Sequence, residues 1–141
     1  MCKWILLFII IFFSSITVAK VDINLACKEK NEQKHSLLTR LSTSVTEAHL
    51  AGQCTGYESY SKIDFTKSCS EFVEQKKSLL SFSTSLKEAH LAGICVGAIY
   101  RVAQDCKVDT YNLDYSQIAN GAFSLRLVEE RLGCYGNIYG W

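Results

Sequence analysis

The cysteines constrain the fold of this chain more than any other feature of its sequence. Seven occur in 141 residues, and such a count in a short chain predicts a disulfide framework if the chain reaches an oxidising compartment. Proline is absent, which favours long helices, because proline removes a backbone donor and clashes inside a helix. We therefore expect a helical scaffold that is cross-linked by disulfide bonds.

Four of the cysteines lie in an internal repeat. The segments 27–56 and 69–97 share most of their residues, and each carries two cysteines at matching places. The register between them slips by one residue near Leu41. Because insertions are tolerated in loops rather than in packed helices, the slip locates a loop inside each repeat.

Helix signals occur at the same places in both repeats. Ser44-x-x-Glu47 and Ser85-x-x-Glu88 have the form of capping boxes, in which the two side chains bond free backbone N–H groups at a helix start. Apolar residues recur at spacings of three and four on both sides of these boxes. Each repeat is thus predicted to form an αα-hairpin, which is a helix, a short Ser/Thr turn and a second helix.

The two hairpins are expected to differ in burial. Residues 91–103 are nearly all apolar or small, so the helix that contains them is expected at the centre of the molecule. The matching stretch of the first repeat, 53–60, is more polar and is expected at the periphery. A linker over 61–68 is expected to follow it.

The rest of the chain predicts one more helix. Asp114-x-x-Gln117 is again a capping box, and Gly133 stands where a glycine commonly ends a helix. We therefore predict an all-α, disulfide-stabilised domain over 20–141, built from two duplicated hairpins and a C-terminal helix.

The N-terminal segment 1–19 has the order of a secretory signal peptide. A positive start at Lys3 is followed by an apolar run over 4–13 and by small residues at Thr17 and Ala19. The run is shorter than the roughly 20 residues that a membrane anchor needs. We predict cleavage after Ala19, a secreted or periplasmic location, and no membrane contact after cleavage.

The charge of the chain gives no reason to expect a nucleic-acid partner. Lysine and arginine total 15 against 14 aspartate and glutamate residues. This balance leaves no basic field that would attract phosphate groups.

The repeat also predicts how the six cysteines of the mature chain pair. Cys27 and Cys54 lie at similar distances from the predicted turn, roughly 15–20 Å at about 1.5 Å per helical residue, so they can face each other. Equivalent cysteines should pair equivalently, which predicts Cys69 with Cys95. Cys106 and Cys134 remain, and their bond would tie the last helix to the second hairpin.

The sequence contains no pattern typical of catalysis or of zinc binding. No C-x-x-C pair or close Cys/His cluster occurs, so disulfides are favoured over a metal site. His49 and His90 each precede a cysteine by five residues, which places the two side chains about 140° apart on a helix and argues against a Cys–His nucleophile. A metal joining His49 to His90 stays open beside a packing role. We predict no enzyme activity and no cofactor.

Short cysteine motifs resemble those of a known family. Cys54-Thr-Gly-Tyr57 and Cys95-Val-Gly-Ala98, followed by Cys106, Gln117 and Cys134, are similar to motifs of the small periplasmic immunity proteins of the Rap/Tai type. These proteins block cell-wall amidases that type VI secretion delivers. The resemblance covers mainly Cys69 to Cys134. It implies a helical binding protein whose partner is another protein, here a peptidoglycan amidase effector.

A second class of function is a periplasmic chaperone or stress protein of the small helical disulfide type. An inhibitor binds one partner stoichiometrically, whereas a chaperone binds many clients and exposes apolar surface under stress such as acid. Three histidines and a balanced charge offer little for an acid switch, which favours the inhibitor. Both classes are compatible with a homodimer.

The expected partner surface is the segment Lys107–Leu113, which has no counterpart in the first repeat. A disulfide at Cys106 and a helix cap at Asp114 would hold its two ends. A pre-ordered loop loses less entropy on binding, and tyrosine is a frequent interface anchor. The candidate partner-binding residues are Lys107, Asp109, Tyr111 and Asn112. A solvated connector is the alternative, and the aromatic tail 134–141 is expected to pack as a strap or to serve as a recognition arm.

Overall fold

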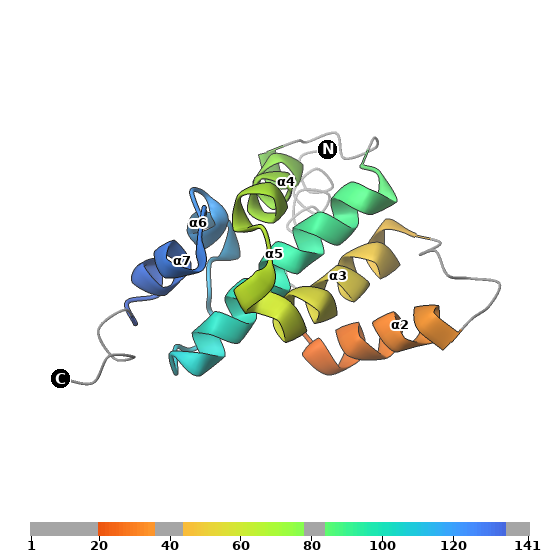
Figure 1. The fold of residues 1–141 in the computed structure, drawn as a ribbon, viewed down its shortest axis with the longest axis horizontal. Coiled ribbons are helices and arrows are strands. Elements are labelled where there is room, and N and C mark those ends of the chain that lie inside the picture. The colour runs from red at the N-terminus through yellow and green to blue at the C-terminus, as the bar shows by residue number, and fades with distance from the viewer. Residues whose placement is uncertain (1–19, 36–43, 78–83, 135–141) are drawn as a thin grey trace, which may run out of the picture.

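The computed structural model describes residues 20–35, 44–77 and 84–134, and this part of the chain is helical without a strand (Figure 1). The elements are α2 (Ile23–His35), α3 (Val45–Ser59), the 3-10 helix η1 (Tyr60–Lys62), α4 (Phe65–Lys77), α5 (Leu86–Asp105), α6 (Tyr115–Ala119) and α7 (Leu125–Arg131). The all-α prediction is confirmed. The predicted signal peptide 1–19 and the aromatic tail beyond Cys134 lie outside the described residues. None of the helices in the described ranges has the length and apolar character that a bilayer crossing requires.

Capping boxes begin both second helices, as the sequence predicts. The Ser44 hydroxyl accepts from the Glu47 backbone N–H at 3.2 Å, and the Ser44 N–H donates to the Glu47 carboxylate at 3.1 Å. The box that opens α5 has the same two bonds, at 3.2 and 2.7 Å. Each box satisfies two backbone donors that the first helical turn leaves free.

Aspartates cap both first helices, and this signal extends the repeat toward the N-terminus. Asp22 accepts from the Leu25 N–H at 3.1 Å, and Asp64 accepts from the Lys67 N–H at 3.0 Å. Each aspartate stands five residues before the first cysteine of its repeat. The linker expected over 61–68 is therefore wrong in its second half, because Asp64 starts α4 at Phe65.

The helices α3 and α5 meet at four glycines, Gly52, Gly56, Gly93 and Gly97. A Cβ atom on Gly52 would lie 2.1 Å from the carbonyl oxygen of His90, and one on Gly93 would lie 2.1 Å from that of His49. Separations below about 3 Å do not occur between real atoms of this kind, so only glycine allows the two backbones to come this close. The contacts are reciprocal, because Gly52 and Gly93, like His49 and His90, are equivalent in the repeat.

The position of α3 corrects the expectation for residues 53–60. Gln53, Cys54 and Gly56 are buried, because α3 lies between α2 and α5 rather than at the edge (Figure 1). Thr55 and Tyr57 are partly accessible to solvent, and Glu58 near the end of the stretch is exposed.

The hydrophobic core surrounds α5, the longest helix. Its buried members include Val96, Ile99 and Val102 of α5, Phe65 and Phe72 of α4, and Ile118 and Val128 of the C-terminal helices. Three disulfides cross-link the elements, and they are the pairs that the repeat predicts: Cys27–Cys54 between α2 and α3, Cys69–Cys95 between α4 and α5, and Cys106–Cys134.

The single C-terminal helix predicted over 114–133 is wrong. The chain forms α6 and α7 with a turn between them, in which Gly121 has a φ of +88° that L-residues rarely adopt. Ser124 caps α7 by accepting from the Leu127 N–H at 3.3 Å. The Arg131 guanidinium donates to the Gln117 carbonyl at 2.8 Å and so satisfies the open end of α6. The apolar residues Ile118, Ala122 and Val128 of this stretch are buried, and they come from α6, the turn and α7 in that order.

Candidate functional site

The segment Lys107–Leu113 begins at a well-defined helix end. The N–H of Val108 donates to the Ala103 carbonyl at 2.9 Å, and the N–H of Lys107 donates to the Gln104 carbonyl at 3.0 Å, which is the Schellman pattern. Lys107 has a φ of 57°, in the left-handed region that favours glycine. The backbone therefore leaves α5 in a fixed but strained direction.

Asp109 organises the segment from within. Its carboxylate accepts from the Tyr111 backbone N–H at 2.9 Å and from the Asn112 side-chain amide at 3.3 Å. Asp114 accepts from the Gln117 N–H at 3.0 Å and so fixes the far end. Of the four candidate partner residues, Asp109 thus hydrogen-bonds to Tyr111 and Asn112, while Lys107 lies at the start of the segment.

Tyr111 is the most exposed large apolar side chain of this region. Its relative exposure is 67 %, and the ammonium group of Lys20 lies 5.4 Å from the ring centroid. An exposed aromatic ring beside charged and amide side chains has the composition of an interface anchor.

The two repeated histidines, His49 and His90, link α3 and α5 by hydrogen bonds where these helices cross. His90 Nδ1 lies 3.2 Å from the Ala48 carbonyl oxygen, and because a carbonyl only accepts, Nδ1 carries the proton. His49 hydrogen-bonds the backbone of Ala89 in the reciprocal way. Burial lowers the pKa of His49, and the charges of Lys76 and His90 add to this effect, while the bond to Ala89 opposes it. Both rings thus connect one glycine-bearing helix to the backbone of the other.

One group of potential metal ligands occurs in the described ranges, and its chemistry does not suit a metal. The sulfur atoms of Cys27 and Cys54 and a carboxylate oxygen of Glu58 lie within 4.8 Å of one another. The two sulfurs are bonded to each other, so neither is the thiolate that a metal ion would need. Glu58 forms an ion pair with Lys30 instead.

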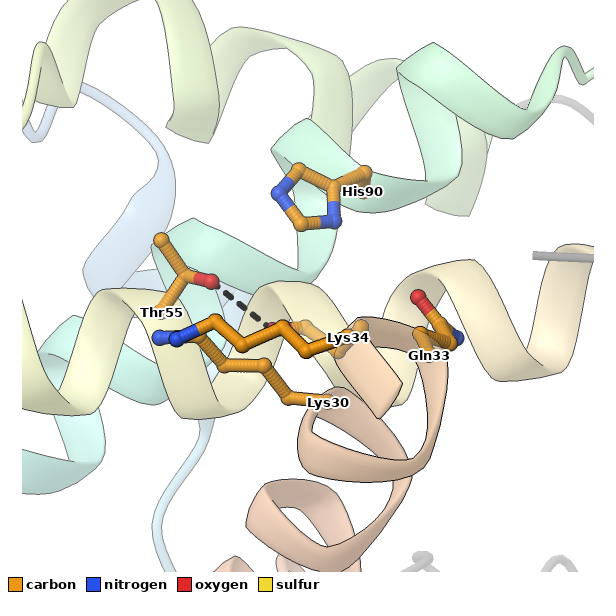
Figure 2. Close-up of a pocket in the computed structure, with 6 residues that line it drawn as sticks. Lys30, Gln33, Lys34, Thr55 and His90 are labelled. Atoms are coloured by element: carbon orange, nitrogen blue, oxygen red, sulfur yellow. Dashed lines mark hydrogen bonds between the residues drawn. The ribbon is translucent and has the colours of Figure 1, made fainter. Parts of the chain in front are cut away.

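An open cleft of about 400 Å³ lies over α2, α3 and α5. It is lined by Lys30, Gln33, Lys34, Ala51, Thr55 and His90 (Figure 2). The two lysine side chains extend from α2 toward Thr55, and the ring of His90 lies on the other side of the cleft. The sequence patterns described above do not predict this cleft, although Lys30 and Thr55 differ from their counterparts in the second repeat, and this difference is a signal of it.

Comparison with known proteins adds no relative to this description. No protein-family model, no curated protein and no solved structure matches the chain.

Proposed function

We propose that the protein is a secreted or periplasmic binding protein, and that it acts as an immunity protein by inhibiting a peptidoglycan amidase effector. The observation that carries the binding role is the ordered loop 107–113, which is fixed at both ends and presents Tyr111 to solvent. The short cysteine motifs, which resemble those of the Rap/Tai-type immunity proteins, support the choice of partner.

The disulfides support the proposed location. Disulfide bonds persist in oxidising compartments such as the bacterial periplasm and are rare in the cytosol. Three of them occur in the described part of this small chain, and the sequence before Lys20 has the order of a signal peptide.

We also infer that the segments 22–59 and 64–105 are two copies of one αα-hairpin. Equivalent aspartate caps, equivalent capping boxes and equivalent disulfides support this inference. The loop 107–113 lies outside both copies. Leu113 at its end packs against the core, whereas Lys107, Asp109, Tyr111 and Asn112 are exposed.

The proposal predicts stoichiometric inhibition of a cell-wall amidase. The mature chain with its disulfides oxidised is added to type VI amidase effectors from several classes, and the release of peptide from purified peptidoglycan is followed. One effector should lose its activity at equimolar protein. Tyr111→Ala and Asp109→Ala should weaken this inhibition without lowering the unfolding midpoint.

Phe123→Ala is the matched control, because Phe123 is a similarly exposed aromatic residue outside the loop. It should inhibit as strongly as the unsubstituted protein. The amidase proposal fails if no effector is inhibited, and the chaperone class replaces it if the protein instead suppresses aggregation of several unrelated unfolded clients. Inhibition that survives both loop substitutions would place the interface elsewhere.

A further inference from the structure

We propose that the cleft over α2, α3 and α5 binds a carboxylate carried on a short methylene chain, and that Lys30 and Lys34 recognise the charge. This inference does not rest on the proposed amidase partner, because the cleft shares no residue with the loop 107–113. It is argued from a difference between the two repeats, which places Lys30 at the cleft beside Lys34.

The second repeat fills the equivalent positions with apolar side chains. Lys30 corresponds to Phe72, and Thr55 corresponds to Val96. Phe72 and Val96 are both buried in the hydrophobic core. The first repeat carries a cation and a hydroxyl there instead, and these residues line an open cleft. Packing alone would favour the apolar pair, since burying polar groups costs free energy.

The lysines concentrate positive charge that the protein only partly balances. The side chain of Lys30 is 19 % exposed and pairs with Glu58. Lys34 lies one helical turn further along α2, and no carboxylate in the described ranges pairs with it. Like charges at this spacing repel each other, so an anion in the cleft would stabilise both lysines.

The walls of the cleft favour an organic acid over an inorganic anion. The methyl group of Ala51 and the methylene chains of the two lysines give the cleft an apolar lining next to the ammonium groups. The residues that line the cleft lie within helices, so no helix N-terminus offers free N–H groups to an inorganic anion there. No arginine lines the cleft either, so such an anion would lack a two-donor partner. A dicarboxylate such as glutarate, or a glutamate side chain of a peptide, combines the required charge with an apolar stem.

The test is an NMR titration of the oxidised mature protein with glutarate, with sodium chloride used to hold the ionic strength constant. We expect saturable shifts of the backbone amides around Lys34, Thr55 and His90, with a Kd on the order of 1 mM. An N-acetylated, amidated Gly-Glu-Gly peptide tests whether a protein side chain is accepted as well as a free acid.

Matched variants come from the other repeat. Lys34→Gln should weaken glutarate binding about tenfold or more, whereas Lys76→Gln, at the equivalent place on α4, should leave it unchanged. The double variant Lys30→Phe, Thr55→Val copies the second repeat, so it should abolish binding without lowering the unfolding midpoint. It keeps the proposal testable if Lys34→Gln fails to fold.

Several results would overturn the proposal. These are shifts that do not saturate, equal shifts with sodium chloride alone, and equal losses in Lys34→Gln and Lys76→Gln. Inorganic phosphate that binds as tightly as glutarate would overturn the role given to the apolar walls and with it the assignment of a carboxylate.

Discussion

Single glycines decide whether α3 and α5 can meet. A Cβ on Gly93 would lie 2.1 Å from the His49 carbonyl oxygen and 3.0 Å from the Gln53 backbone nitrogen. Neither neighbour is a flexible side-chain end, so the helices would have to separate. The four glycines therefore serve close packing, even though glycine is a poor helix former.

Gly93→Ala gives a prediction in which two effects have opposite signs. Helix propensity alone would stabilise the variant by about 1 kcal/mol, whereas overpacking costs about 1–3 kcal/mol or more. Because the clash is with backbone, we expect a net loss of about 2 kcal/mol in the free energy of unfolding, measured with urea. A gain in stability would show that the two backbones are not this close.

His49 predicts how stability depends on pH. Burial lowers its pKa in the folded protein, so the unfolded chain binds the proton more readily. Its contribution is then present above the unfolded value of 6.5 and is lost as pH falls through the lower folded pKa.

We expect the urea midpoint to fall as the pH is lowered from about 7.5 to about 5, a range that spans the ordinary histidine pKa. His49→Gln should reduce that fall. His35 is exposed at the end of α2, so His35→Gln is the control and should keep the slope of the unsubstituted protein. An identical slope in both variants would assign the pH dependence to other groups.

At the scale of elements, the caps account for most helix boundaries. Ser85→Ala removes the hydroxyl that accepts from Glu88, and we expect a loss of about 1 kcal/mol in unfolding free energy. Ser70→Ala is the control, because Ser70 is exposed within α4 and its hydroxyl donates only to the Lys67 carbonyl. A similar effect of both substitutions would contradict the role of the cap.

The two Schellman ends offer a matched pair. Gly133 ends α7 with a φ of +73°, and Lys107 ends α5 with a φ of 57°. Lys107→Gly should raise the free energy of unfolding by about 1 kcal/mol, and Gly133→Ala should lower it by about the same amount, because a Cβ is disfavoured in this region. Thermal unfolding of both variants measures this, and a Lys107→Gly variant that is less stable would show that the strain is absent.

Local signals in the sequence predict these elements well where a side chain acts within a few residues. The serine capping boxes and the glycine at 133 are of this kind. The sequence does not predict the break between α6 and α7, because the apolar residues Ile118, Ala122, Leu125 and Val128 recur at helical spacing across it. Arg131 satisfies the open end of α6 from fourteen residues away. The start of α4 was missed because Asp64 was included in a linker.

At the scale of the whole molecule, the repeat predicts the pairing of the cysteines but not how the repeats meet. The reciprocal contacts of Gly52 and Gly93 with the opposite helix depend on the crossing of α3 and α5, which the sequence pattern does not specify. The cleft depends on the same arrangement, since His90 from the second repeat closes a site on the first. The sequence predicts both anchors of the loop 107–113, although only the cap at Asp114 is local, since the disulfide joins Cys106 to Cys134, 28 residues further on.

The central claim is that the protein is a disulfide-linked helical module of an oxidising compartment, with each repeat closed by its own bond. Non-reducing peptide mapping by mass spectrometry, applied to the protein isolated from the cells that produce it, tests this claim most directly. We predict an N-terminus at Lys20 and the bonds Cys27–Cys54, Cys69–Cys95 and Cys106–Cys134. A bond between the two repeats, or free thiols at these six positions, would contradict it.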